Sequence, residues 1–301
     1  MTAALIITNG RTDTRRAFAP SKEVGTISAV RRIVRVFQCA GVERIVAVCG
    51  EEVRKETAHM GLVFLGGRPE GEMLDNVKTG LAYLRGKCGA ALVTHVNVPL
   101  FSAGTVRTLL EAEGDVRVPV CGGVPGHPVL LRAERFPDVL AYVGAGGLAG
   151  AVRALSPRRV EVPDEGILAN IAGGESYGRL VEGHDLAHLR FDLQLRLARE
   201  QIFYGPGAHQ LLQLTGETGS LLEACRQMGI SYSKGRKIVA SIERQTGRPV
   251  LESRQGGPAG GGSALTEEGR RLVERYAALC REANERLEEI FEKYFPRGPQ
   301  S

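Results

Sequence analysis

The chain has 301 residues, more than the roughly 100–200 typical of one domain, so its length predicts two domains. A composition with 43% hydrophobic and 24% charged residues is that of a globular protein, and no apolar run approaches the roughly 18 residues of a membrane span, which excludes a membrane-spanning class. The formal net charge of +5 permits a polyanionic partner, while six cysteines without CxxC spacing exclude a disulfide framework and predict reduced thiols in a cytoplasmic protein.

The first half of the chain alternates strand and helix patterns. A continuous apolar run over Ala3–Thr8, ended by Asn9-Gly10, predicts a strand buried on both faces and not a signal peptide. Further strands are predicted at Arg44–Val48, Leu62–Phe64, Ala90–Val96, Arg117–Val120 and Val129–Leu131, and helices at Ile27–Phe37, Glu51–His59, Asp75–Leu84 and Thr105–Ala112. This alternation predicts an α/β fold with a Rossmann-like, doubly wound and mostly parallel sheet, whose ligands bind at the carboxyl ends of the strands.

A glycine-rich segment ends this first domain. Asn170–Gly183 contains four glycines and has no strong period, which is typical of a domain edge and linker. We therefore expect domains at 1–183 and 184–301. From Asp185 onward, leucines at helical spacing predict a helix that leads into the second domain.

The second domain has capping and turn residues at the spacing of a helix-turn-helix. Ser220 is placed to cap a helix that begins at Leu221, Gly229 provides a tight turn, and Ser231 caps a second helix. Two short strands, Arg248–Arg254 and Ser263–Leu265, flank a glycine-rich tip, and a long helix follows. The pattern predicts a mainly α winged helix-turn-helix domain.

Positive charge gathers on the second of these helices. From Arg190 to Arg254 there are 10 Lys and Arg against 6 Asp and Glu, and the N-terminal half of the helix is the densest part. In helix-turn-helix proteins this half enters the major groove, so we predict contacts with double-stranded DNA; a solvated charged face is the alternative interpretation. The candidate DNA-binding residues are Ser231, Tyr232, Ser233, Lys234, Arg236, Lys237, Arg254 and Gln255.

The residues from Phe191 to Phe295 resemble the DNA-binding domain of the molybdate-responsive ModE regulators, a LysR-type winged helix-turn-helix. The resemblance implies a homodimer that binds a pseudopalindrome, built by outer helices for which Phe191–Phe203 and Leu279–Phe295 are the candidates. Arg236 stands where the family commonly has Trp, so the family's target sequence is not implied. The separate molybdate-binding domains of ModE are not expected, because the chain ends soon after the last helix.

Over Ala3–Asn170 the chain resembles MobA-like nucleotidyltransferases, which transfer a nucleotide from an NTP to an acceptor such as molybdopterin. The matching stretches are ALIITNGRTDTR, AGVERIVAVCG, MLDNVKTGLAYL, VNVPLF, GHPVLL and VPDEGIL. The resemblance implies a nucleotide site in the loop after the first strand, where glycine permits close backbone approach and cations pair with phosphates; a solvated basic loop is the alternative. The candidate nucleotide-binding residues are Asn9, Gly10, Arg11, Arg15, Arg16 and Lys22.

One departure from this family concerns the metal. Asn97 stands where the family has an Asp that binds Mg²⁺, and an amide oxygen is a weaker ligand for a hard cation than a carboxylate. We therefore expect catalysis to suffer more than nucleotide binding, with Mg²⁺ and an NTP as the only candidate cofactors. His127 is a candidate for catalysis or for a loop hydrogen bond, Asp164 and Glu165 for metal binding or a solvated turn, and His95 for a structural role.

Together these patterns predict a cytoplasmic transcriptional regulator whose nucleotidyltransferase-like domain senses a nucleotide or a molybdenum-cofactor-related ligand. The alternative is an active Mg²⁺-dependent nucleotidyltransferase that carries a regulatory DNA-binding domain. A third possibility is that the first domain is only a scaffold. No membrane partner is expected.

Overall fold

A computed structural model describes residues 1–8, 23–24, 27–57, 60–68, 71–171, 181, 191, 193–254 and 262–295. The chain divides into two compact units, Met1–Arg190 and Phe191–Ser301. The sequence-predicted boundary near Gly183 lies outside the described residues, so the division at 183/184 stays a proposal.

The N-terminal unit is built on a mixed, mostly parallel sheet. Its strand order is β10-β7-β9-β6-β1-β4-β5, with β8 paired to β7. The β9 strand is antiparallel to β6 and β7, whereas the other pairs along this path are parallel. The predicted Rossmann-like sheet is therefore confirmed. The strands are β1 (Thr2–Ile7), β4 (Arg44–Cys49), β5 (Leu62–Gly66), β6 (Ala90–His95), β7 (Val116–Cys121), β8 (Val124–Pro125), β9 (Val129–Arg132) and β10 (Arg158–Glu161).

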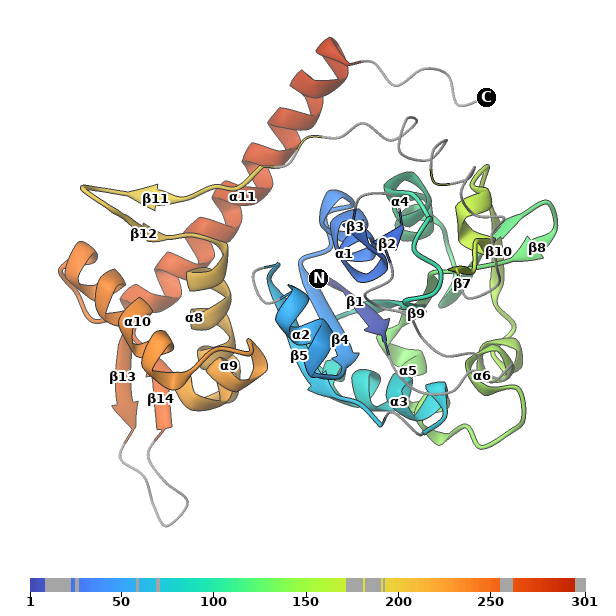
Figure 1. Ribbon diagram of the computed structural model, residues 1–301, viewed down its shortest axis with the longest axis horizontal. Helices are drawn as coiled ribbons and strands as arrows, with labels where there is room; N and C mark the ends of the chain where they lie inside the picture. The colour runs from blue at the N-terminus through green and yellow to red at the C-terminus, as the bar shows by residue number, and fades with distance from the viewer. Residues whose placement is uncertain are drawn as a thin grey trace. The chain divides into compact units, whose positions relative to one another are not determined.

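Helices cover both faces of this sheet (Figure 1). The central strand β1 is buried on both sides: Ala4 and Ile6 belong to the core cluster that includes residues of α1 and α4, whereas Leu5 lies against Gly80 of α3. Burial on both faces explains why the strand reads as a continuous apolar run. The helices are α1 (Ala29–Cys39), α2 (Glu51–Thr57), α3 (Met73–Leu84), α4 (Ala103–Glu111), α5 (Phe136–Ala141) and α6 (Gly147–Ala154), with 3-10 turns η1 (Ala133–Arg135) and η2 (Glu165–Leu168) and a small β2 (Glu23–Val24) and β3 (Ile27–Ser28) ladder.

The C-terminal unit is mainly helical and contains two hairpins. A short antiparallel hairpin precedes three helices, a second hairpin follows them, and a long helix ends the unit. None of the described helices is both long and apolar enough to cross a membrane. The elements are β11 (Leu197–Ala198), β12 (Ile202–Tyr204), α8 (Pro206–Thr218), α9 (Leu221–Gln227), α10 (Tyr232–Thr246), β13 (Leu251–Arg254), β14 (Gly262–Leu265) and α11 (Glu267–Tyr294).

The helix predicted from Asp185 through Phe203 is wrong where the structure describes it, because residues 193–204 are extended or form the β11–β12 hairpin. Leu193, Leu195 and Leu197 alternate with exposed residues, and this period of two is the signal of a half-buried strand. The Tyr276 hydroxyl donates a hydrogen bond of 2.7 Å to the Leu195 carbonyl, which anchors the extended segment on α11. The proposed outer dimerisation helix at Phe191–Phe203 is therefore an extended segment and hairpin over its described residues.

Candidate functional sites

The corner between α9 and α10 is set by local sequence. The Ser220 Oγ accepts a hydrogen bond from the Glu223 N–H (3.3 Å), and the Ser231 Oγ accepts one from the Lys234 N–H (3.2 Å), so each helix begins at a capping serine. Between them Gly229 has a φ of 66°, in the left-handed region that favours glycine. Both caps and the turn lie where the sequence predicts them.

The crossing of the two helices depends on Gly235, which sequence reasoning missed. A Cβ atom at Gly235 would lie 2.2 Å from the Cys225 Sγ, so α10 approaches α9 more closely than any side chain at this position permits. The Cys225 side chain is only 1% exposed and has little room to move. In the sequence, Gly235 is visible only as a glycine next to the charged cluster. A glycine there is indistinguishable from one that merely weakens a helix.

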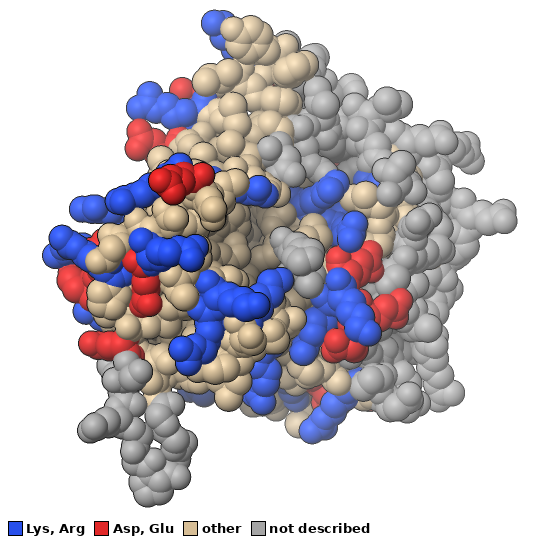
Figure 2. All heavy atoms as spheres, turned by 60° about the vertical axis from the view of Figure 1, so that its left-hand side comes forward, with Lys and Arg blue, Asp and Glu red and all other residues tan. Residues whose placement is uncertain are grey.

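The first two turns of α10 present polar and basic side chains to solvent. Gly235, Val239 and Ile242 are buried on the opposite side of the helix. On the face of the molecule shown in Figure 2, Lys and Arg predominate over Asp and Glu. The exposed residues at the start of the helix are Ser231, Tyr232, Ser233, Lys234, Arg236 and Lys237.

The basic side chains of α10 make no ion pair with another described residue, in contrast to most arginines of α11. Arg270 and Arg271, for example, both pair with Glu267. Arg254 ends β13, where its backbone is in register with Gly262, and Gln255 lies outside the described residues. The structure therefore brings the candidates from Ser231 to Lys237 onto one surface.

In the N-terminal unit, the carboxyl ends of β1, β4 and β6 lie side by side. Ile7 is in register with His95, and the Thr8 N–H and hydroxyl both donate to the Val48 carbonyl, at 3.1 and 3.2 Å. The predicted nucleotide-binding loop would begin directly after Thr8. Its candidate residues, Asn9, Gly10, Arg11, Arg15, Arg16 and Lys22, lie outside the described residues.

Asn97 follows β6 at this edge and is fully buried. Its backbone carbonyl accepts a hydrogen bond of 2.8 Å from the Ile171 N–H, so the segment after η2 runs beside it.

The Asp164 side chain is held by hydrogen bonds within the protein. Its carboxylate accepts hydrogen bonds from the Ser102 N–H (2.8 Å), the Thr105 hydroxyl (2.5 Å) and the Gly166 N–H (2.9 Å). Of the two sequence-based alternatives for Asp164, this geometry supports a structural turn, with the carboxylate bonded inside the protein instead of solvated.

His95 and His127 form a pair at the same edge. Their rings meet edge to face with centroids 4.7 Å apart. Burial, with a smaller contribution from the neighbouring His127, lowers the pKa of His95 to about 3. Burial also lowers the pKa of His127 to about 4, against the opposing effect of a hydrogen bond to the Val93 backbone. Both rings are therefore neutral near pH 7.

This histidine pair could not be found from sequence spacing. His95 ends β6 and His127 precedes β9, and the two meet because Val93 of β6 is in register with Val129 of β9 in an antiparallel ladder. The sequence favours parallel neighbours in an alternating α/β chain, so this antiparallel return is not predicted by the pattern.

The N-terminal unit is similar to known proteins in both sequence and fold. The sequence of residues 11–160 matches the MobA-like NTP transferase domain family. This part of the chain is a MobA-like NTP transferase domain. The fold agrees: a nucleotidyl transferase from Methanothermobacter thermautotroptrophicus superposes with a TM-score of 0.52 at 17% identity, over 62% of this chain and 99% of that chain. Rv0371c from Mycobacterium tuberculosis H37Rv superposes with a TM-score of 0.50 at 16% identity, over 60% and 97%.

The C-terminal region is similar to a second group of proteins. The molybdenum-pterin-binding protein MopB of Rhodobacter capsulatus is 38% identical over 69 residues, which are 23% of this chain and 26% of that protein. The transcriptional regulator ModE of Haemophilus influenzae is 31% identical over 83 residues, 28% of this chain and 32% of that protein. This chain thus spans about a third or less of the length of these relatives. The combination supports a fusion of a MobA-like domain with a ModE-like region.

The described residues of the MobA-like domain do not fit a divalent metal site. Mg²⁺ prefers carboxylate oxygens, yet Asn97 offers a neutral amide and the Asp164 carboxylate is engaged by three donors of the protein. No group of three or more His, Cys, Asp or Glu that could hold a metal occurs among the described residues. We therefore derive no catalytic step through a metal ion at this edge.

Proposed function

We propose that the protein is a DNA-binding transcriptional regulator. In this proposal the C-terminal unit is a winged helix-turn-helix that binds double-stranded DNA through α10, and the MobA-like domain binds a nucleotide or a molybdenum-cofactor-related ligand. The observation that carries the proposal is the exposed row Tyr232, Ser233, Lys234, Arg236 and Lys237 at the start of α10. The N-terminal part of such a helix is the part that docks into the major groove.

The electrostatics of α10 favour an anionic partner. The N-terminus of a helix carries a partial positive charge, so basic residues there oppose the helix dipole. The first turn of α10 contains no acidic residue, in contrast to α11, whose first turn holds Glu267 and Glu268. A DNA phosphate near the Ser231 cap would offset this local repulsion. The charge distribution thus costs the free protein stability and favours the complex.

The second hairpin is the proposed wing. In this proposal the β13–β14 hairpin contacts the backbone or minor groove; Arg254 ends β13, and Gln255, which lies outside the described residues, stays a candidate from the sequence. The relatives support this assignment by their names, because two are transcriptional regulators called ModE and a third is a DNA-binding transcriptional dual regulator of Escherichia coli. DNA binding places the proposed site of action in the cytoplasm.

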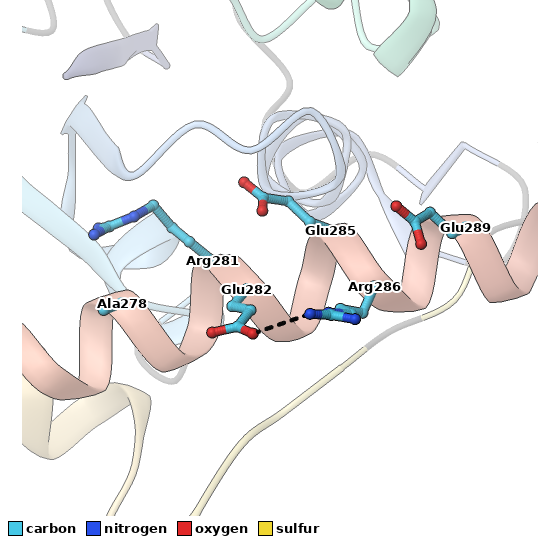
Figure 3. A pocket seen from close by; sticks show the side chains of 6 residues that line it. All are labelled: Ala278, Arg281, Glu282, Glu285, Arg286 and Glu289. Atoms are coloured by element: carbon cyan, nitrogen blue, oxygen red, sulfur yellow. Dashed lines mark hydrogen bonds and ion pairs between the residues drawn. The ribbon is translucent and has the colours of Figure 1, made fainter.

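We further propose that the regulator is a homodimer assembled through α11. Leu279 and Ile290 are 44% and 51% exposed on this helix, which leaves apolar surface for a second copy. A neighbouring stretch of α11 is charged and includes the ion pair between Glu282 and Arg286, 3.5 Å apart (Figure 3). Charged rows beside an apolar stripe fix the register of paired helices. The α10 helices of the two copies, related by a two-fold axis, would then bind a pseudopalindromic DNA site.

A gel-shift assay with the full chain tests DNA binding. We expect discrete complexes with fragments selected from genomic DNA, with an affinity that falls steeply as salt rises, because phosphate contacts release counterions. Binding that is equal for selected and random fragments at moderate salt would contradict a sequence-reading function.

The ligand proposed for the MobA-like domain rests on its family. The candidate loop residues Asn9, Gly10, Arg11, Arg15, Arg16 and Lys22 are proposed to bind phosphates through backbone amides and cations. His95 and His127 at the neighbouring strand ends are neutral and add no charge there. Thermal shifts with individual nucleotides would identify the ligand or assign the domain a scaffold role.

The second candidate function is an active nucleotidyltransferase that uses Mg²⁺ and an NTP, and Asn97→Asp tests it. If the natural chain is a binding domain that lost a metal ligand, the substitution should raise Mg²⁺-dependent pyrophosphate release at least roughly tenfold while nucleotide affinity changes little. In the absence of Mg²⁺ the uncompensated buried carboxylate should destabilise the domain by about 3–5 kcal/mol, and Mg²⁺ should restore the melting temperature. Efficient turnover by the natural chain, lost in Arg11→Ala, would favour the enzyme instead.

A further inference from the structure

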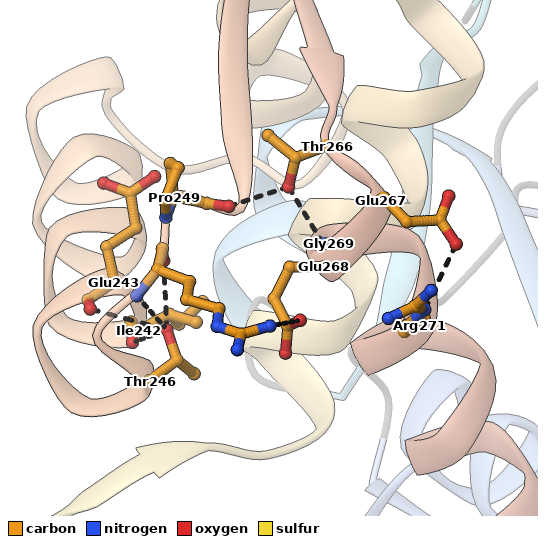
Figure 4. Close-up of polar contacts among 10 residues, drawn as sticks. Ile242, Glu243, Thr246, Pro249, Thr266, Glu267, Glu268, Gly269 and Arg271 are labelled. Carbon is orange, nitrogen blue, oxygen red and sulfur yellow. Dashed lines mark hydrogen bonds and ion pairs between the residues drawn. The ribbon is translucent and has the colours of Figure 1, made fainter.

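The junction between α10 and the β13–β14 hairpin contains a carboxylate bonded to main-chain donors. The Glu243 Oε1 accepts hydrogen bonds from the N–H groups of Val250 (3.0 Å) and Leu251 (3.4 Å), at the start of β13. Figure 4 shows Glu243 on α10 together with Pro249, the residue before Val250. Among the described residues, Glu243 is the one side chain of α10 that bonds β13. Because the donors belong to the backbone, the carboxylate fixes the course of the strand itself and not merely the position of a side chain.

The turn that returns the chain to Glu243 is equally restrained. Helix α10 ends at Gly247, whose φ of 73° reverses the chain direction. The Thr246 hydroxyl lies 3.1 Å from the Arg248 carbonyl and 3.0 Å from the Ile242 carbonyl, both possible acceptors of its proton. The segment from Thr246 to Val250 is therefore held at its helix end as well as at its strand end.

The residues just before β13 are also held by the start of α11. The Thr266 N–H donates to the Val250 carbonyl (3.1 Å), and the Thr266 hydroxyl donates to the Pro249 carbonyl (2.7 Å). A Cβ at Gly269 would lie 2.3 Å from the Val250 carbonyl oxygen, so α11 contacts the strand directly. Val250 itself is fully buried. Val250 is thus bonded to Thr266 through its carbonyl and to Glu243 of α10 through its N–H.

We infer that Glu243 is a positioning residue that fixes the angle between α10 and the β13–β14 hairpin, so that both elements engage one DNA duplex together. The inference rests on the proposed DNA-binding function. A duplex presents its groove and its flanking backbone at a fixed separation, so two elements bind it simultaneously only if their mutual angle is set before binding. Glu243 would act through this angle and not by touching DNA, where its negative charge would be repelled.

Hydroxyl-radical footprinting with Glu243 variants of the full chain tests this role. Glu243→Ala removes both bonds, and Glu243→Asp keeps the charge but withdraws the carboxylate by one carbon. Both should lose protection of the sequence flanking the central groove, keep the central protection, and bind roughly tenfold more weakly, since the hairpin no longer adds to the contact made by α10. Glu243→Gln should retain the wild-type footprint, because an amide oxygen accepts the same two bonds.

The matched control is Glu274→Ala, which removes an exposed carboxylate of α11 and leaves the junction intact. It should leave footprint and affinity unchanged, whereas a loss of affinity and of flanking protection equal to that in Glu243→Ala would show that the effect does not depend on the junction. A full wild-type footprint in both Glu243→Ala and Glu243→Asp would overturn the inference, as would loss of the flanking protection in Glu243→Gln. If the unsubstituted chain leaves no footprint, DNA binding itself fails, and that outcome is distinct from a wild-type footprint in the variants.

Discussion

Replacing Lys234 and Lys237 together by alanine is expected to weaken DNA binding roughly hundredfold at moderate salt, because each exposed cation is worth about 1–3 kcal/mol when it contacts a base edge or phosphate. Both side chains are exposed on α10 and make no ion pair with a described residue, so their removal breaks no visible contact of the free protein. The fold should survive, and the unfolding temperature should change little or rise slightly, since the charge of Lys234, which opposes the helix dipole in the first turn of α10, is lost.

Salt dependence separates this effect from a general loss of charge. The slope of log K against log salt should become shallower by about 0.9 for each phosphate contact removed. Lys55→Ala with Arg85→Ala removes two exposed charges from the N-terminal unit and serves as the control. If the control weakens binding as much as the α10 variant does, the affinity reflects net charge and not a docked helix.

The second large effect is expected at Gly235. Gly235→Ala places a methyl group where a Cβ would lie 2.2 Å from the Cys225 Sγ, so the two helices must separate or a buried side chain must leave its rotamer. Overpacking of this kind costs about 1–3 kcal/mol. We expect the C-terminal unit to unfold at a lower temperature in calorimetry and DNA affinity to fall with it, while the N-terminal unit is unaffected.

A compensating substitution makes this prediction specific. Cys225→Ala removes the sulfur that the new methyl group would meet, so the double variant Cys225→Ala, Gly235→Ala should regain most of the lost stability. If the cost of Gly235→Ala is unchanged in the Cys225→Ala background, the contact with Cys225 does not determine the effect. Alanine favours a helix over glycine, so propensity alone predicts stabilisation, the opposite sign.

The parts of the fold that follow from local rules were predictable from sequence. The strand β1 has an unbroken apolar run because both of its faces are buried, and the caps Ser220, Ser231 and Thr266 lie one residue before their helices, where a side-chain oxygen meets free N–H groups. The order of α9, the turn at Gly229, α10 and the β13–β14 hairpin was predictable for the same reason.

The errors and omissions come from features that depend on tertiary context. Leu189, Leu193 and Leu197 fit a helical spacing of four as well as a strand spacing of two. The hydrogen bond from the Tyr276 hydroxyl to the Leu195 carbonyl is made with the extended segment, and the local sequence does not reveal it. The pairing of His95 with His127 depends on the antiparallel entry of β9. The role of Glu243 depends on a turn that brings Val250 back to α10, and no local pattern encodes that return.

Sequencing of genomic DNA recovered with the full chain tests whether the start of α10 binds specific DNA sequences. We expect the natural chain to enrich discrete sites that share a pseudopalindrome, and the Lys234→Ala, Lys237→Ala variant to recover none of them above background. Equal recovery by both proteins, or recovery of random fragments by the natural chain, would contradict this expectation.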